Sequence, residues 1–384
     1  MVERRYFLSL ATKSSVVAFP CFAIAENFLS TKSKKINKGK LVSSKDELTF
    51  PRDFGAHLLY GIEWWYVTGW LNDRVDEELA FQLTFFRRKT FIGENNISRF
   101  SPKHLIFAHA TIISKRLGVL KSAQRAGRLG SGLVKCSSLD TDIQFEDWFM
   151  KRDLTSDSYK IGVQGNDFSF RLRLQPQAKL KNLILRGKNG LSRKGPDDKQ
   201  ASWYYSRPNI VTNGKVVVNK KTLHMQGLSW LDHEWSSEFL HPEAIGWDWI
   251  GVNLADGGSL MAFKIRRADE SIIWSDFSML DAKGDNHPLI NKNKLENIAQ
   301  TVRWMTLGEW SSPVSFAKYP IFQKILFGDN VLKITPFINN QEIDARRTTG
   351  GFYWEGAVEL DINGKFFGKG FLELTGYSSP LLLG

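Results

Sequence analysis

The chain has 384 residues, 42% of them apolar and 24% charged, which predicts a globular protein long enough for two domains. Its formal net charge is +12, but the first 25 residues and five lysines between residues 32 and 40 carry more than half of it. The folded part is therefore only mildly basic, which argues against a nucleic-acid partner. Thirteen Trp, 27 Phe and 9 Tyr supply rigid apolar surface that can fill a core or line a cavity.

The N-terminus has the pattern of an export leader. The pair Arg4-Arg5 stands before Phe7-Leu8, and a modestly apolar stretch ends at the small-residue site Ala23-Ile24-Ala25. We expect a twin-arginine signal peptide over residues 1–25, and hence a periplasmic or secreted protein. Residues 26–50 are expected to form a flexible, Lys-rich linker.

Two further features bear on anchoring and on stability. No later segment reaches the roughly 18 apolar residues that a membrane-spanning helix needs, so we expect no transmembrane segment. The two cysteines are Cys21 and Cys136. Removal of the leader would leave one of them, so burial rather than a disulfide is expected to stabilise the fold.

Strand patterns dominate the rest of the chain. Apolar side chains alternate with small or polar ones from Leu79 to Phe85, which is the period of a half-buried strand. Asn213-Gly214 and Asn363-Gly364 stand between apolar runs and predict type I′ hairpin turns. Helical patterns are scarce, the best being a short one over 295–300. The expected fold class is all-β, with antiparallel sheets closed into barrels.

A weak internal repeat suggests how many barrels there are. Trp64-x-Tyr66 recurs as Trp247-x-Trp249, and the Leu and Asp residues that follow each copy keep the same offset of 183 residues. Two units of this length fit two lipocalin-like barrels. We predict an N-terminal domain over 51–226 and a C-terminal domain over 227–384.

Four short clusters set polar groups among aromatic side chains. A carboxylic acid surrounded by aromatic rings has a raised pKa and can donate a proton near neutral pH. Asp248 lies between Trp247 and Trp249, but alternation along a strand points it away from both rings. Asp248 is therefore expected either to face a pocket beside His233 or Tyr204, or to be an ionised partner of a group such as Arg207 at the packed joint of the domains.

An ordered series of strings resembles the signature of the AttH-like, carotenoid 1,2-hydratase-related proteins. The resemblance implies two lipocalin-like domains and, for the hydratase branch, cofactor-free addition of water to an isoprenoid double bond; fungal relatives are associated with Diels–Alder cyclisation. His233 and Trp235 match the His-x-Trp element of the hydratases, and Asp248 matches their acid. The series includes Glu63-Trp64-Trp65-Tyr66, Tyr204-Tyr205-Ser206-Arg207-Pro208, Asp232-His233-Glu234-Trp235, Gly246-Trp247-Asp248-Trp249, Tyr353-Trp354-Glu355-Gly356 and Leu372-Glu373-Leu374.

Other chemistries lack their motifs. There is no Gly-x-Ser-x-Gly elbow of a serine hydrolase, no second histidine to complete a zinc-protease helix after His233, and no glycine loop that would cradle a phosphate. We therefore expect neither a metal nor another cofactor.

The leading hypothesis is a cofactor-free hydratase or related lyase that acts on an apolar molecule of isoprenoid type. In it Asp248 donates the proton, and His233 and Glu234 position water or the acid. The alternatives are a lipocalin-like lipid carrier working beside an export transporter, and a purely structural interaction protein. The expected pocket residues are Trp65, Tyr66, Tyr204, Tyr205, Trp235 and Trp247, and the expected structural or electrostatic partners are Glu63, Arg207, Asp232 and Glu355.

Overall fold

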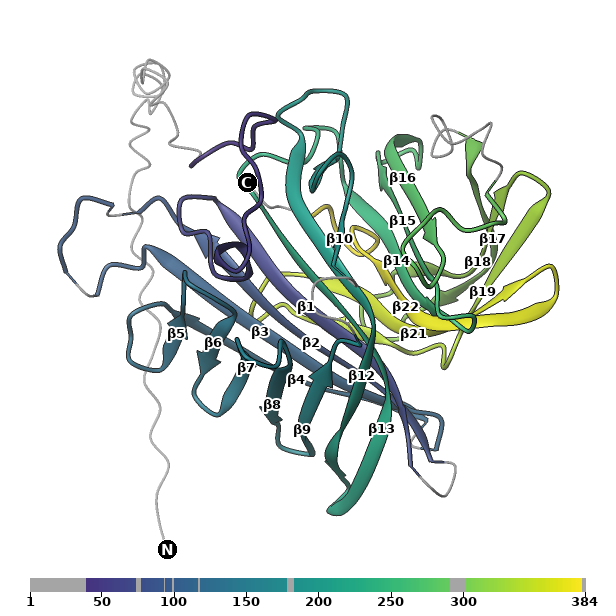
Figure 1. The fold of residues 1–384 in the computed structure, drawn as a ribbon, viewed down its shortest axis with the longest axis horizontal. Helices are drawn as coiled ribbons and strands as arrows, with labels where there is room; N and C mark the ends of the chain where they lie inside the picture. The colour runs from purple at the N-terminus through teal and green to yellow at the C-terminus, as the bar shows by residue number, and fades with distance from the viewer. Residues whose placement is uncertain are drawn as a thin grey trace, which may run out of the picture. The chain divides into compact units, whose positions relative to one another are not determined.

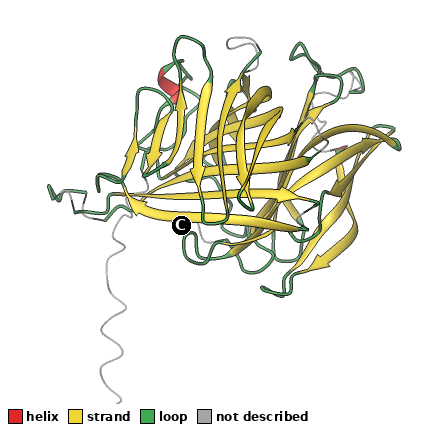
Figure 2. Cartoon of the chain, turned by 90° about the horizontal axis from the view of Figure 1, so that it is seen from below, coloured by secondary structure: helices red, strands yellow, loops and turns green. Residues whose placement is uncertain are grey.

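The computed structural model describes residues 39–73, 77–92, 94–98, 100–116, 118–177, 183–290 and 301–381. These residues form 22 β-strands and one 3-10 turn, Arg52–Phe54, so the chain is all-β as predicted (Figure 2). Within the described part of the chain, no helix has the length and hydropathy to cross a membrane. The expected leader, residues 26–38 of the expected linker and the helix expected over 295–300 lie outside the described residues.

The first thirteen strands form one antiparallel sheet in the order β4-β3-β2-β1-β13-β12-β9-β8-β7-β6-β5, with β10 and β11 paired to β12 (Figure 1). Its strands are β1 (Ile62–Asn72), β2 (Glu78–Lys89), β3 (His104–Ser114), β4 (Val119–Arg128), β5 (Val134–Cys136), β6 (Asp142–Phe145), β7 (Trp148–Arg152), β8 (Tyr159–Gln164), β9 (Phe168–Gln175), β10 (Ile184–Leu185), β11 (Leu191–Arg193), β12 (Ala201–Val218) and β13 (Lys221–Ser236).

The other nine strands form a second antiparallel sheet in the order β16-β15-β14-β22-β21-β19-β18-β17, with β20 paired to β21. Each sheet curves strongly on itself and forms a lipocalin-like half-barrel. The strands are β14 (Gly246–Leu254), β15 (Ser259–Arg266), β16 (Ile272–Leu280), β17 (Arg303–Ser311), β18 (Lys318–Phe327), β19 (Asn330–Pro336), β20 (Glu342–Asp344), β21 (Phe352–Ile362) and β22 (Lys365–Leu374).

The two copies of the internal repeat occupy matching places in separate sheets. β1 lies between β2 and β13, and β14 lies between β15 and β22. In each sheet the first strand thus pairs with the strand that follows it and with the last strand of the same sheet. This arrangement agrees with a duplicated unit.

Strand β13 belongs to the first sheet along its whole length, so the sheets change between Ser236 and Gly246. The expected boundary at residue 226 falls inside β13. The hairpin turn expected at Asn213-Gly214 is wrong, because the chain turns at Asn219 and Lys220, which have φ values of 51° and 63°. Gly214 instead lies within β12, where a Cβ would come within 2.2 Å of a backbone oxygen of β9. The turn predicted at Asn363-Gly364 is confirmed.

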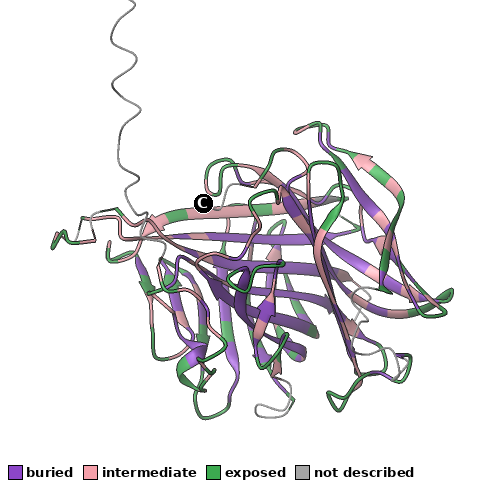
Figure 3. Cartoon of the chain, turned by 90° about the horizontal axis from the view of Figure 1, so that it is seen from above, coloured by how far each residue is buried: buried purple, intermediate pink, exposed green. Residues whose placement is uncertain are grey.

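Alternation along the strands divides most of the buried apolar side chains among three cores. On β1, Trp65 and Val67 face the interior of the first half-barrel, whereas Tyr66 and Trp70 face the second sheet. The interior of the second half-barrel forms a core of its own. Burial therefore runs along both faces of the strands where the sheets meet (Figure 3), and Trp70 Nε1 donates to the Gly370 oxygen across this joint at 2.9 Å.

Candidate functional site

A cavity of about 220 Å³ lies in the joint between the two sheets. Its first-sheet wall comes from β1, β2, β3, β12 and β13, and its second-sheet wall comes from β14, β15, β21 and β22. Aromatic rings form a large part of the lining and carboxyl groups are set among them, as expected for a ligand pocket. The lining includes Trp64, Tyr66, Phe86, His109, Lys194, Tyr204, Asp232, Glu234, Phe239, Trp247, Trp249, Phe263, Tyr353, Glu355 and Glu373.

Glu355 is deeply buried in the wall of the cavity, with 1% of its surface exposed. The Tyr66 hydroxyl donates to its Oε1 at 2.5 Å. Burial raises the pKa of Glu355 well above its ordinary value, and the negative charge of Glu373 adds to the rise. Burial therefore favours the protonated form of Glu355, which can give a proton to a molecule in the cavity.

Glu373 lies directly opposite Glu355 in the register of β22 and β21. Directly opposed residues of antiparallel strands hold their side chains about 5 Å apart on one face of the sheet. Trp247 Nε1 donates to Glu373 Oε2 at 2.7 Å, and burial raises the pKa of Glu373 to about 7. The two carboxyls form an acid pair in which burial raises both pKa values, that of Glu373 to about 7.

Asp232 is held on the opposite wall by three donors. The hydroxyls of Tyr204 and Ser206 and the Nε1 of Trp230 donate to its two oxygens at 2.8, 2.5 and 2.8 Å. Burial nevertheless raises the pKa of Asp232 to about 6. Trp249 Nε1 reaches the same Tyr204 hydroxyl at 3.2 Å, so the network joins the two sheets.

Glu234 forms the one ion pair that a described lysine makes inside the cavity. Lys194 Nζ lies 3.1 Å from Glu234 Oε1 and 3.1 Å from the Ser192 hydroxyl. The Ser202 hydroxyl also donates to Glu234. Its charge is thus compensated, unlike that of the Glu355 and Glu373 pair.

The connection between β20 and β21 closes one side of the cavity. Residues Thr348, Thr349 and Gly351–Tyr353 contribute to the lining. His109 of the first sheet bonds to the Thr348 hydroxyl at 2.7 Å and to the Tyr353 hydroxyl at 2.8 Å. Burial lowers the pKa of His109 to about 4, so a neutral imidazole latches this loop to β3.

A second cluster lies inside the first half-barrel, away from this joint. His57, Glu63 and His233 hold their ligand atoms within 4.8 Å of one another, as a metal site would. However, Arg87 Nε donates to Glu63 at 2.8 Å, and both imidazoles bond to the same Glu63 oxygen. Although burial alone would raise it, the charges of Arg87 and His57 hold the pKa of Glu63 well below its ordinary range. A divalent cation would add positive charge beside Arg87, so these residues fit an ion cluster better than a metal site.

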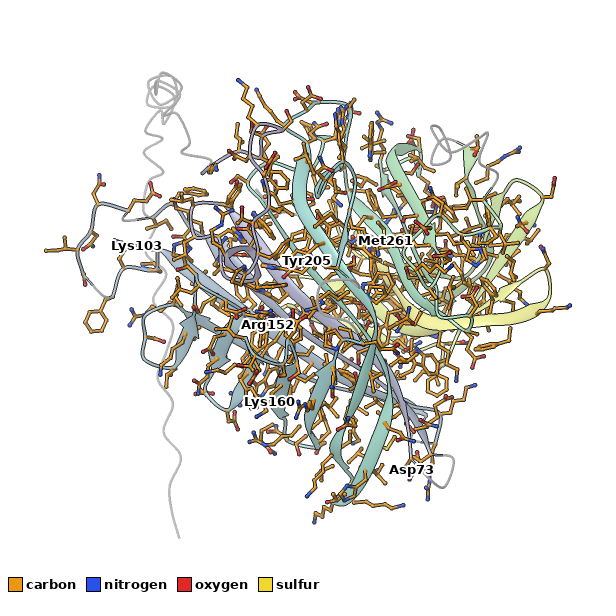
Figure 4. All side chains as sticks on the ribbon, in the orientation of Figure 1. Asp73, Lys103, Arg152, Lys160, Tyr205 and Met261 are labelled. Atoms are coloured by element: carbon orange, nitrogen blue, oxygen red, sulfur yellow. The ribbon has the colours of Figure 1, made fainter. Side chains whose placement is uncertain are left out.

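Aromatic residues enclose this ion cluster. The His57 ring stacks on Trp235 with centroids 3.6 Å apart, and Trp65 stacks on His233 at 4.7 Å. Tyr205, labelled in Figure 4, bonds through its hydroxyl to His233 Nδ1 at 2.9 Å. Burial lowers the pKa of His233 to about 4. These hydrogen bonds and ring contacts hold the polar cluster in place inside the half-barrel.

The structure separates the three residues expected to act together. On β13, His233 faces the interior of the first half-barrel and Glu234 faces the cavity, because adjacent strand residues point to opposite faces. Asp248 lies outside the cavity lining, within the second half-barrel. The catalytic set of Asp248, His233 and Glu234 expected from the sequence therefore does not form one site.

Asp248 is fully buried in an ion network. Arg266 Nε and Lys264 Nζ lie 2.9 and 3.0 Å from its two oxygens, and the Tyr377 hydroxyl donates at 2.9 Å. The expected partner Arg207 pairs with Asp157 instead, at 2.6 Å inside the first half-barrel. The expectation that Asp248 points away from its two tryptophan neighbours is confirmed, since Trp247 and Trp249 line the cavity and Asp248 does not.

The remaining expected residues divide between the two locations. Tyr66, Tyr204, Trp247, Asp232 and Glu355 line the cavity, whereas Trp65, Tyr205, Trp235 and Arg207 lie inside the first half-barrel. Glu63 is counted in the cavity lining, but its carboxylate belongs to the ion cluster.

Sequence reasoning missed Glu373, Lys194 and His109. A partial signal for Glu373 was available, because it stands between Leu372 and Leu374 and shares a strand face with Phe371. Lys194 gave no signal, because it lies on an irregular segment.

A larger hollow of about 460 Å³ lies elsewhere on the joint, beside Trp70, Asn209 and Asn253. The acidic side chains in its lining, Glu78 and Asp281, are partly exposed, and Glu78 is paired with Lys369. It lacks the buried acid pair of the smaller cavity, which is therefore the candidate site.

The fold and the site define an all-β protein with two lipocalin-like domains and a carboxyl-lined cavity between them. The chain belongs to the AttH-like family, whose model matches residues 41–377. The crystal structure of an AttH from Nitrosomonas europaea is similar, with 38% identity, a TM-score of 0.79, and coverage of 88% of this chain and 99% of that one. Kievitone hydratase from Nectria haematococca shares the fold at 12% identity and a TM-score of 0.65, over 89% of this chain and 97% of its own. A search of curated proteins found no significant match.

Proposed function

We propose that this protein is a cofactor-free acid catalyst that adds water to a carbon–carbon double bond of a compact apolar molecule of isoprenoid type. The observation that carries the proposal is the neutral carboxyl of Glu355 in an aromatic cavity, opposite a second carboxyl that titrates near pH 7. An unactivated alkene requires a neutral acid that is shielded from water, and Glu355 meets both requirements.

The reaction would proceed in two proton transfers. The O–H bond of Glu355 breaks as a C–H bond forms on the alkene, which leaves a carbocation and the Glu355 carboxylate. A water oxygen then bonds to the cationic carbon, and the Glu373 carboxylate takes the excess proton. Transfer of that proton from Glu373 to Glu355 restores the starting state, so the net change is addition of one water.

The remaining residues support this chemistry without reacting. Tyr66 fixes the orientation of Glu355 through Oε1, and Trp247 does the same for Glu373. The rings of Trp249 and Tyr66, which meet edge to face at 5.4 Å, supply electron-rich faces beside the developing cation. A cavity of about 220 Å³ suits a small isoprenoid or the end of a longer one.

The test is turnover of the ten-carbon alkenes myrcene and geraniol in water labelled with oxygen-18, followed by mass spectrometry of the alcohol product. The wild-type protein is expected to incorporate the label, and Glu355→Gln to lose at least about a hundredfold in rate. Glu359→Gln, four residues further along the same strand and outside the cavity lining, is the matched control and should retain full activity. Labelled product at an undiminished rate in Glu355→Gln would refute the role of Glu355.

A non-enzymatic lipid carrier is the second candidate, because the loop latched by His109 and the aromatic lining would enclose a ligand equally well. Native mass spectrometry of protein recovered from cells distinguishes the two. A carrier is favoured if the wild type and Glu355→Gln both carry the same lipid and the variant retains it no longer than the wild type. Such a carrier would work beside an export transporter.

Export through the twin-arginine route is also part of the proposal, on the strength of Arg4-Arg5. Replacing both arginines by lysine should leave the protein in the cytoplasm. Unchanged recovery from the periplasm would count against this leader.

A further inference from the structure

The cavity carries an excess of acid. Four carboxyl groups, those of Asp232, Glu234, Glu355 and Glu373, line it, and the ammonium of Lys194 compensates one of them. Among the described residues, no Lys, Arg or His side chain forms an ion pair with Glu355 or Glu373. One end of the cavity therefore holds acid without a cation.

Aromatic rings surround the same end. Trp247 lies beside Phe239, with centroids 6.3 Å apart, and Phe239 lies 5.8 Å from Trp64. Tyr66 and Trp249 complete the enclosure from the two sheets. Ring faces attract a cation through their quadrupole, most strongly when water is excluded.

Elsewhere in the cavity, Lys194 already shows this arrangement filled by the protein itself. Lys194 Nζ lies 4.1 Å from the ring centroid of Phe263 and 4.8 Å from that of Tyr204, beside the Glu234 carboxylate. Rings and a carboxylate thus hold an ammonium there. The Glu355 and Glu373 end offers the same groups with no ammonium among the described residues.

We propose that the cavity selects compact organic cations, meaning protonated or quaternary amines with apolar substituents, and holds the charged nitrogen between Glu373 and the rings of Trp247 and Trp249. This inference rests on the proposed function in one respect: an amine of this shape carries its charge where a carbocation would develop, so it would inhibit the hydration. Binding of the amine does not itself require any turnover.

The groups that face the cation set the pH dependence. The pKa of Glu373 is about 7 and that of Asp232 about 6, whereas burial raises the pKa of Glu355 well above its ordinary value and lowers that of His109 to about 4. Arg87 is held by Glu63 in the ion cluster, Arg88 also lines the cavity, Lys194 is paired with Glu234, and the charge of Arg186 acts on Asp232. The affinity for a quaternary ammonium, whose charge does not titrate, should therefore rise between pH 6 and pH 8.

The probe pair is benzyltrimethylammonium and its neutral carbon isostere neopentylbenzene, which differ in charge but hardly in shape. Isothermal titration of the full chain at pH 8 should show that the cation binds at least about tenfold more tightly than the neutral isostere. At pH 6 the cation should bind about three- to tenfold less tightly than at pH 8. Glu373→Gln should remove both the preference and the pH dependence while leaving the isostere unaffected. Glu359→Gln is the control.

Equal affinity for the two probes, a preference for the neutral one, or no binding of the cation at millimolar concentration would each overturn the inference. The wild-type comparison decides this even if Glu373→Gln fails to fold. The proposed function can fail separately: a cation-selective protein that hydrates no alkene keeps the inference and loses the enzyme, whereas a working hydratase without cation preference loses the inference alone.

Discussion

The hydroxyl of Tyr66 in the first sheet donates to Oε1 of Glu355 in the second sheet at 2.5 Å, although 289 residues separate the two in the chain. This hydrogen bond crosses the joint of the two domains. It fixes the acid and leaves its second oxygen, for which the described residues show no hydrogen bond, to face the cavity. The geometry of the proposed acid thus depends on the docking of one sheet against the other.

Tyr66→Phe removes this donor and little else. We expect turnover at pH 7 to fall about tenfold, because loss of the hydrogen bond raises the pKa of Glu355 further and frees its orientation. Stability should fall by about 1–3 kcal/mol. Tyr319→Phe is the matched control, since its hydroxyl donates to Glu342 at 2.9 Å inside the second half-barrel. A similar drop in activity in both variants would contradict a specific role for Tyr66.

Glu373→Gln should change how stability depends on pH. The folded pKa of about 7 lies above the ordinary 4.5, so the folded state holds its proton longer than the unfolded chain does. The contribution of Glu373 to the free energy of unfolding is fully present below pH 4.5. It is lost as the pH rises through 7, by up to roughly 3 kcal/mol. The variant should therefore gain stability relative to the wild type between pH 5 and pH 8.

That difference, rather than the wild-type curve, is the quantity to measure by urea denaturation. His109 and His233 have pKa values lowered to about 4, so they make the folded state more stable as the pH rises through the same range. Both proteins share this contribution, and it cancels. A difference that is flat with pH would show that Glu373 is not a buried acid.

Asp248→Asn should damage the fold and not the chemistry. It leaves Arg266 and Lys264 buried without their carboxylate, for which a cost of about 3–5 kcal/mol is typical. We expect a large fall in melting temperature and unchanged turnover per folded molecule. Loss of activity at full stability would instead restore Asp248 as the acid.

Thr348→Val should loosen the loop over the cavity. The hydroxyl lost in this nearly isosteric change bonds to His109 and to Gln124 of the first sheet, at 2.7 and 2.8 Å. Amide hydrogen exchange in residues 345–353 should become at least about tenfold faster while the strands keep their protection. Thr349→Val, at the exposed neighbouring position, is the control and should leave exchange unchanged.

The sequence by itself determined the class of the fold, because strand alternation and turn residues are local signals. It also determined which side chains share a face of a strand: Trp247 and Trp249 had to point to one face and Asp248 to the other, and they do. Local turn chemistry was ambiguous at Asn213-Gly214, where the close approach of β9 required a glycine for a different reason.

Only the tertiary structure decided which carboxyl is the candidate acid. Strand alternation predicts that Glu234 and His233 point to opposite faces of the sheet. It does not predict which face packs against the other sheet and which face lines the half-barrel interior. The answer depends on contacts between β1 and β21, strands almost 300 residues apart, and on burial that raises the pKa of Glu355 while Arg266 and Lys264 neutralise Asp248. Such long-range contacts leave no periodic trace in the chain, so the acid could be recognised only where the two sheets meet.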